Sequence, residues 1–445
     1  MATWKAPEEF AEWINWLAAG LHGRSRWRLS VVLLGMLFGG GRRTVTSWLR
    51  GAGVDANFSA YYYFIAALGR KTIPLATRLL TLLLRHLPIG DRALLVLDDT
   101  PTKRYGSKVQ GAGIHHNPTP GPTAQKFLYG HNWVTLSLSL RHSLWNTIGL
   151  PLIAGLYVRQ VDLAKLPKKL KWKFATKLLI GARLVEWAAK ILQDARKTVW
   201  LVADGAYAKR PFLRAMSAAS VIVVSRLRKD AALWELPPDR TKGPCGRGRP
   251  RKYGKHRISL AKRAAHALGW QAIECSVYGK LATKTYKTFL AVSRPAGGAI
   301  RVVLVKNEDG TWLPLFCTDT QAGVREIIEA FGDRACIEQD FHDVKEVWGT
   351  GQQQVRTIWA NIGCYHLNLW SHTLVELWAW YKRKRAICDR RASPWDNAER
   401  RPSHADRRKA LRRACIEQEY SSSKPRNPLP RKFTCLVQRL RKLAA

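Results

Sequence analysis

The segment ALLVLDDT (residues 93–100) decides the fold, because it is an apolar run that ends in two aspartates, Asp98 and Asp99. A short apolar run of this kind predicts a buried strand, and its acidic end predicts carboxylates at the rim of a sheet. The segment TVWLVADGAY (198–207) repeats the pattern and presents Asp204. Two strand ends that carry acids predict a site at one edge of the sheet.

The segments around these two strands indicate a mixed α/β sheet. WVTLSLSL (133–140) alternates apolar and polar residues as a half-buried strand does, and GLPLIAGLYV (149–158) has the composition of a further strand. A basic amphipathic helix is expected at about 168–194, before the strand SVIVVSRL (220–227). Antiparallel strands followed by alternating helix and strand favour a mixed sheet.

Residues 1–88 are expected to be helical. GRRTVTSWLRGAGV (41–54) and SAYYYFIAALGRK (59–71) indicate short helices around a turn that contains glycine, and both carry basic side chains. A helix-turn-helix that binds DNA and a plain helical bundle with a basic face both fit this pattern, and the sequence leaves the two open.

The remainder of the chain divides by composition into four parts. Residues 89–228 hold the first part of the sheet, and 229–318 begin with a basic Gly/Pro-rich segment and continue as hairpin strands with NEDG as a turn. Residues 319–385 are expected to be core helices, and 386–445 a basic C-terminal tail. We expect that tail to be flexible and to contact phosphates.

Charge and composition narrow the class of partner. The 445 residues include 74 Lys and Arg against 32 Asp and Glu, a formal net charge of +42. Such a chain favours a polyanionic partner, nucleic acid before an anionic membrane surface. The longest apolar stretch, LSVVLLGMLFGGG (29–41), is too short to span a bilayer, and no signal peptide is evident. Eight scattered cysteines without a C-x-x-C pair indicate reduced thiols and a cytoplasmic protein.

The segment DRACIEQDFHDVK (333–345) carries a third acid in a helical pattern. At about 100° per residue, Phe331, Arg334, Glu338 and Lys345 fall within an arc of about 60°. Ile337, Phe341, Val344 and Trp348 would form an adjacent apolar stripe that docks the helix on the sheet. Arg334 and Glu338 fit a surface ion pair, but Lys345 has no acid partner on this arc.

The spacing Phe331-x2-Arg334-x3-Glu338-x6-Lys345 resembles the Y-R-E-K signature of bacterial cut-and-paste insertion-sequence transposases, which have a DDE catalytic triad. VLDDT and VADGAY resemble the two aspartate motifs of that family, and the strands between Asp204 and Glu338 resemble its β-strand insertion domain. The resemblance covers about residues 40–385. Phe331 departs from the pattern, which has tyrosine at this position.

This resemblance implies a ribonuclease-H-like core in which Asp98, Asp204 and Glu338 bind two Mg²⁺ or Mn²⁺ ions, with Asp99 as the alternative first acid. Phe331, Arg334 and Lys345 would lie on the DNA near the scissile bond. The implied activity is cleavage at element ends and strand transfer. The implied partners are double-stranded DNA, as terminal repeats and target, and a second copy of the chain at synapsis, in a bacterial cytoplasm on the nucleoid. A nuclease on the same fold and an inactive DNA-binding relative are the alternatives.

Two further segments suggest binding sites. GRGRPRKYG (246–254) resembles an AT-hook, in which Arg247, Arg249 and Lys252 would contact A·T-rich DNA. A basic loop that contacts phosphates without sequence preference also fits. In residues 111–133, His115, His116 and His131 raise the question of a metal, but the spacing of a zinc finger is missing. A loop along the active-site rim or the DNA is therefore favoured.

Overall fold

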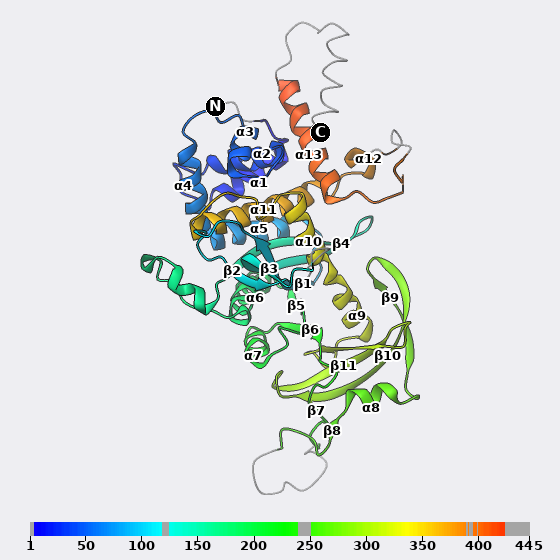
Figure 1. Cartoon of the computed structure of the whole chain (residues 1–445). Helices are drawn as coiled ribbons and strands as arrows, with labels where there is room; N and C mark the ends of the chain where they lie inside the picture. The colour runs from blue at the N-terminus through cyan, green and yellow to red at the C-terminus, as the bar shows by residue number, and fades with distance from the viewer. Residues whose placement is uncertain are drawn as a thin grey trace.

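A computed structural model describes residues 4–117, 124–238, 251–388, 390, 395–397 and 399–422. The molecule is elongated, with helices at one end, a sheet across the middle and a strand-rich extension at the other end (Figure 1). The first and last described helices, at residues 8–18 and 404–422, both lie at the helical end (Figure 1). Among the described helices, none combines the length and apolar character needed to cross a bilayer.

The N-terminal part is helical, as predicted. It consists of α1 (Glu8–Ala18), α2 (Arg28–Phe38), α3 (Val45–Gly51), α4 (Phe58–Gly69) and α5 (Thr72–His86). Thr44 caps α3 by accepting a hydrogen bond from the Ser47 backbone N–H at 3.1 Å. Whether α3 and α4 act as a helix-turn-helix stays a prediction.

The central sheet is mixed, as predicted. Its strands are β1 (Arg92–Lys103), β2 (Gly113–His116), β3 (Phe127–His142), β4 (Asn146–Tyr157), β5 (Thr198–Ala203) and β6 (Ile222–Arg226). The order β4-β3-β1-β5-β6 places β1 between an antiparallel neighbour, β3, and a parallel one, β5. β5 and β6 are also parallel. An antiparallel meander on one side and parallel crossovers on the other therefore meet at β1.

Two expectations about these strands are wrong. β1 does not end at Asp98 but continues to Lys103, because β3 keeps pairing with it as far as Gly130. Only the pairing with β5 stops there, at Leu97 and Ala203. β3 is also not half-buried, since its polar residues Thr135 and Ser137 are covered like its apolar ones.

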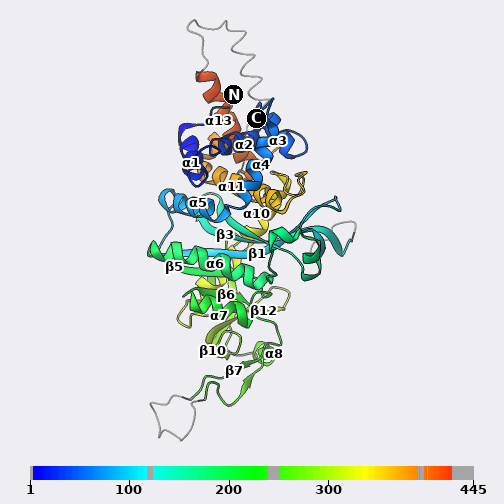
Figure 2. The same cartoon turned by 90° about the vertical axis from the view of Figure 1, so that its left-hand side faces the viewer.

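Helices cover both faces of the sheet. α6 (Lys177–Asp194) crosses one face (Figure 2), and α7 (Arg210–Ala218) links β5 to β6. The other face carries α9 (Val324–Asp333) and α10 (Ala335–Glu346), followed by α11 (Ile358–Ala379). α6 begins later than predicted, because short 3₁₀ helices occupy Gln160–Lys165 and Lys168–Leu170.

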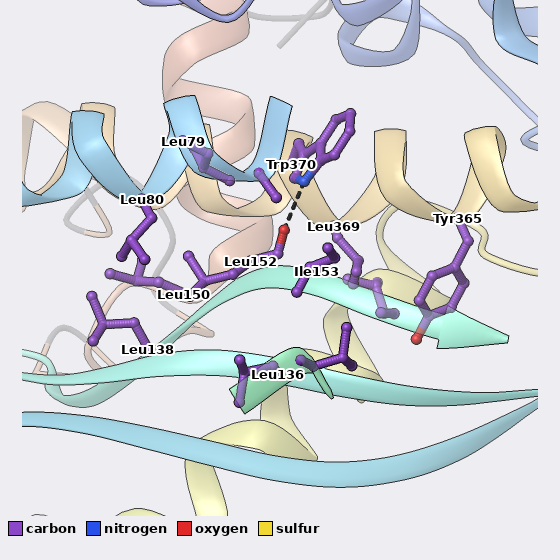
Figure 3. Close-up of a cluster of buried hydrophobic side chains, with 14 of the residues drawn as sticks. Leu79, Leu80, Leu136, Leu138, Leu150, Leu152, Ile153, Tyr365, Leu369 and Trp370 are labelled. Carbon is purple, nitrogen blue, oxygen red and sulfur yellow. Dashed lines mark hydrogen bonds between the residues drawn. The ribbon is translucent and has the colours of Figure 1, made fainter. Parts of the chain in front are cut away.

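The apolar core joins α5, α11 and the sheet. Leucines from α5, β3 and β4 interlock beneath α11, and Trp370 of α11 donates a hydrogen bond to the Leu152 carbonyl at 2.8 Å (Figure 3). Close helix contact also holds α11 to α4. A Cβ on Gly69 or Gly363 would lie 2.0–2.1 Å from a carbonyl oxygen of the facing helix, so only glycine allows this approach.

The inserted segment extends the sheet. Its elements are β7 (Leu233–Trp234), β8 (Arg257–Ile258), α8 (Leu260–Ala265), β9 (Gln271–Val277), β10 (Lys280–Ser293), β11 (Gly298–Lys306) and β12 (Trp312–Cys317). The predicted hairpin turn at 307–310 is confirmed between β11 and β12. β12 pairs antiparallel with β6, so the insertion and the core share one continuous ladder.

The C-terminal region is only partly as expected. After α12 (Lys384–Ile387), residues His404–Ser422 form the long helix α13. The expectation of a flexible tail is wrong for α13, because Arg407 forms a buried bidentate ion pair with Glu376 of α11 at 2.8 and 2.9 Å. Residues 423–445 lie outside the described part.

Candidate active site

Asp98 and Asp204 lie at the same level of the sheet. The register pairs Leu97 of β1 with Ala203 of the parallel strand β5, and the residue that follows each of them is an aspartate. The two carboxyl groups interact electrostatically, since the negative charge of Asp204 is one of the influences that raise the pKa of Asp98. The meeting of two acids at this edge is what the two strand patterns predicted.

Asp98 and Asp99 point to opposite faces of β1, as neighbours on a strand must. Asp99 faces α6, where its carboxylate accepts a hydrogen bond from Lys177 at 2.6 Å and one from the Tyr207 hydroxyl at 3.4 Å. Asp98 lies on the face covered by α10, where it accepts a hydrogen bond from Arg334.

α10 brings two charged residues to Asp98. The apolar side chains Ile337 and Phe341 pack on Val96 of β1, which docks the helix as predicted. Arg334 sits at the junction of α9 and α10 and donates one hydrogen bond to Asp98 at 2.8 Å and another to Glu338 at 2.7 Å. One guanidinium therefore joins the first and third acids of the predicted triad.

The environments of these acids differ. Burial raises the pKa of Asp98 to about 6, although the Arg334 charge and the Asp99 backbone N–H act in the opposite direction. The Glu338 side chain is 62% exposed, and that of Asp204 is 36% exposed with Arg226 3.7 Å away. The site is thus open on the side of Glu338 and Asp204 and closed beneath Asp98.

Lys345 lies two turns further along α10, on the same face of the sheet as Asp98. It donates a hydrogen bond to the Thr100 hydroxyl at 2.6 Å, and burial lowers its pKa. No carboxylate pairs with it among the described residues. Lys345 and Arg334 together fix the orientation of α10 along β1.

Comparison with known families identifies the chain. The family model described as DDE superfamily endonuclease matches residues 17–284. The chain belongs to the DDE superfamily endonucleases. The match includes Asp98 and Asp204 and ends before Glu338, so the family model does not reach the third acid of this endonuclease.

Other comparisons add little. No curated protein matches this DDE endonuclease. Among solved structures it is similar to a cryo-EM structure of the piggyBac transposase synaptic complex with hairpin DNA, at 9% identity and a TM-score of 0.39. That alignment covers 98% of this chain and 76% of the other. A similarity this low does not show that the two proteins share a fold or a function.

The carboxylates of the endonuclease suit a hard divalent cation. Asp98, Asp204 and Glu338 offer only oxygen donors, which Mg²⁺ and Mn²⁺ prefer. Asp98 is half-buried beside a second acid, an arrangement that needs nearby positive charge to keep both carboxyl groups ionised. Arg334 supplies part of that positive charge. Glu338 and Asp204 are exposed on the solvent side, where a divalent cation could supply the rest.

A second group of possible ligands fits a metal poorly. Asp343, His372 and His404 offer ligand atoms within 4.8 Å of one another, beside a cavity of about 240 Å³. The two imidazole rings stack at 4.0 Å with planes 18° apart, so an ion in the plane of one ring lies off the plane of the other. His404 also uses both nitrogens, toward Glu376 at 2.6 Å and Trp348 at 2.8 Å. We therefore interpret the group as a structural polar network.

The remaining predicted residues lie away from the acids or outside the described part. His131 is buried and hydrogen-bonded to Arg104 and the Gln110 carbonyl, and the three loop histidines are not among the described groups that could share an ion. Lys252 is exposed, whereas Arg247 and Arg249 lie outside the described residues. Phe331 is half-buried, with the Arg334 guanidinium 5.9 Å from its ring centroid.

Sequence reasoning missed the cations that border the acids. Lys177 reaches Asp99 from α6, and Arg226 approaches Asp204 from the end of β6. Tyr207 lies inside the quoted motif VADGAY but was not singled out. Arg226 is the last residue but one of the predicted strand SVIVVSRL. Because β5 and β6 are parallel, the end of β6 lies beside Asp204, which directly follows β5, so the sequence did contain a signal for Arg226.

Proposed function

We propose that this DDE endonuclease is a DNA transposase of the bacterial cut-and-paste insertion-sequence type. The observation that supports the proposal is the Arg334 bridge between Asp98 and Glu338, together with the charge interaction of Asp98 with Asp204. The three carboxylates are not among the described groups whose ligand atoms all lie within 4.8 Å of one another. Asp98 lies within β1 and Asp204 directly follows the neighbouring parallel strand β5, while Glu338 is linked to Asp98 through Arg334. The mixed sheet that presents them supports a ribonuclease-H-like core.

In this proposal Asp98, Asp204 and Glu338 hold two Mg²⁺ or Mn²⁺ ions. When bound, such ions activate the attacking oxygen and stabilise the leaving oxygen of an in-line phosphodiester displacement. Arg334 orients Asp98 and Glu338 toward each other and screens their charges. Asp99 serves the opposite face and is not a ligand.

Lys345 is suited to contact DNA next to the acids. Its ammonium has three donors, and Thr100 accepts from one of them. A phosphate near the scissile bond would give the half-buried Lys345 ammonium the anion that it lacks. Phe331 would contact the DNA beside this phosphate, next to the Arg334 guanidinium. It lacks the hydroxyl of the tyrosine that the family signature has at this position.

The partners follow from the reaction. Double-stranded DNA would be bound as element ends and as target, and two copies of the chain would be needed to hold two ends together. The net charge of +42 supports a polyanionic partner and a place on the bacterial nucleoid.

The test uses the purified full chain, Mg²⁺ or Mn²⁺, and labelled duplexes taken from the DNA that flanks the gene. We expect nicked and joined products. Glu338→Gln should abolish both while retaining duplex binding. Glu346→Gln, which removes an exposed acid from the same helix, should leave both. Cleavage by Glu338→Gln would refute the triad; nicks without joining would indicate a nuclease, and binding alone an inactive relative.

A further inference from the structure

Three arginines meet where α13 passes the end of α2. Arg43 precedes α3, and Arg408 and Arg412 lie one turn apart on α13. Burial and the nearby charges of Arg43 and Arg412 lower the pKa of Arg408 to about 9. Burial and Arg412 likewise lower the pKa of Arg43. The three guanidiniums are therefore close enough to repel one another, and they remain charged at neutral pH.

Acid side chains do not balance this cluster within the described part of the chain. None of the three arginines forms an ion pair there, and Arg408 donates only to the Met36 and Leu37 carbonyls at 3.2 and 2.9 Å. The atoms Nη1 of Arg43, Nε of Arg408 and Nε of Arg412 are buried without a hydrogen-bond partner. The sequence of 423–445 contains no Asp or Glu.

Aromatic rings hold two of the guanidiniums in place. Arg408 lies over Trp348 at 5.1 Å and Arg412 over Phe38 at 5.3 Å. The Phe38 ring itself stacks on Trp4 at 3.9 Å. Cation–π contacts of this kind keep the guanidiniums from swinging apart into solvent. The cluster is thus organised before any ligand arrives.

The cluster is also hydrogen-bonded to the loop that follows α10, the helix that carries Glu338. The Arg43 backbone N–H donates to Gln352 at 2.8 Å, and its carbonyl accepts from Gln353 at 3.3 Å. Both glutamines lie in the loop after α10, which Arg104 of the β1–β2 connection also binds, at the Gly351 and Gln353 carbonyls. The position of the arginines is therefore fixed relative to Glu338 and Lys345.

The surface beside the cluster is open. Gly40, Gly41 and Arg42 are exposed, and a Cβ on either glycine would meet nothing within 4 Å. A phosphate group can therefore approach along the 40–42 segment. Guanidinium forks match phosphate oxygens in pairs, which makes arginine clusters suitable for a DNA backbone.

We propose that Arg43, Arg408 and Arg412 together bind one phosphate of the DNA backbone. The site lies between the N-terminal helices and α13, away from the acid site. It would hold these helices and α13 on the same DNA duplex. This inference rests on the proposed DNA-binding function. It assigns α13 a role in holding DNA.

The experiment compares full-length wild type with Arg412→Gln on a labelled random-sequence duplex in metal-free buffer, over a range of salt concentrations. The slope of log affinity against log salt should fall by about 1 in magnitude, with binding weakened roughly five- to tenfold. Without DNA, the thermal midpoint should stay equal or rise, because one repelling charge is gone. Arg43→Gln should behave in the same way.

Lys409→Gln is the matched control, because it removes an exposed charge from the same helix. If Arg412→Gln and Arg43→Gln keep the wild-type slope, or change it no more than Lys409→Gln does, the proposal is refuted while DNA binding itself stands. Wild type that fails to bind the duplex would refute both this inference and the proposed function. A fall in the thermal midpoint for both arginine variants would instead assign the cluster a structural role and overturn the inference.

Discussion

Asp98 and Asp99 are adjacent in sequence, yet their carboxylates lie on opposite faces of β1, one bonded to Arg334 and the other to Lys177. The sequence could not separate them, because both end the same apolar run. In the structure they belong to different surroundings. Only Asp98 shares a face with Glu338.

Asparagine substitutions should therefore separate the two aspartates. Asp98→Asn is expected to lower DNA cleavage by about 10³-fold or more, as loss of an essential transition-state group does. Asp99→Asn should cost less than about tenfold, because Asp99 only anchors α6 through Lys177. Initial rates of strand cleavage on one labelled duplex measure both. Equal losses would contradict the assignment of Asp98 to the acid site.

Stability should show the same pairing between Asp98 and Arg334. Arg334→Gln leaves the half-buried Asp98 carboxylate beside Asp204 without its cation, and it is expected to cost about 1–3 kcal/mol of unfolding free energy. Asp98→Asn/Arg334→Gln should recover most of that loss, because no uncompensated charge remains. Urea unfolding in metal-free buffer measures the cycle. Additive losses would mean that the 2.8 Å contact contributes nothing.

The ion pair between α11 and α13 allows a second cycle. Arg407→Met should destabilise the fold by about 3–5 kcal/mol, because Glu376 is left charged and buried. Glu376→Gln/Arg407→Met should be close to wild type. Lys409→Gln, on the same helix but exposed, serves as the control and should change stability by less than about 0.5 kcal/mol. A mild effect of Arg407→Met alone would show that α13 is held by other contacts.

Acid should weaken the fold through buried neutral histidines. Burial lowers the pKa of His131 to about 3, helped by the Arg104 charge, whereas the unfolded side chain titrates near 6.5. The unfolded state therefore binds the proton first, so stability is present above pH 6.5 and is lost as the pH falls toward 3. From pH 7 to pH 5, His131 alone should cost about 2 kcal/mol.

Urea unfolding of wild type and His131→Asn at both pH values measures this contribution. His131→Asn is less stable at pH 7, because it loses packing, but its stability should change less between the two pH values. Parallel pH dependence in the two proteins would show that His131 is not the titrating group.

Local patterns predicted much of the fold and of the candidate site. The apolar runs around Asp98 and Asp204 predicted their strands, and the helical arc predicted both the apolar docking stripe of α10 and the adjacency of Arg334 and Glu338. These features depend on residues within two turns or one strand of each other. Hence they could be recognised without knowing what packs against them.

What the sequence did not reveal depends on distant partners. β1 runs past Asp98 because β3 is long enough to continue pairing, and Ser137 is buried because Asp340 of α10 accepts its hydrogen bond at 2.8 Å. The basic composition of α13 suggested a solvated tail, but Glu376, 31 residues earlier, pairs with Arg407. A composition cannot indicate such a contact.

The continuous ladder from β1 through β6 to β12 has a consequence for how the protein folds during synthesis. β1, β5 and β6 can pair once about residue 226 has emerged, whereas Arg334 and Glu338 follow only after the whole inserted ladder. Until then a nascent chain would present two acids without the third. If the three acids act together as proposed, the order of translation would keep a growing chain, already basic enough to hold DNA, from cutting it.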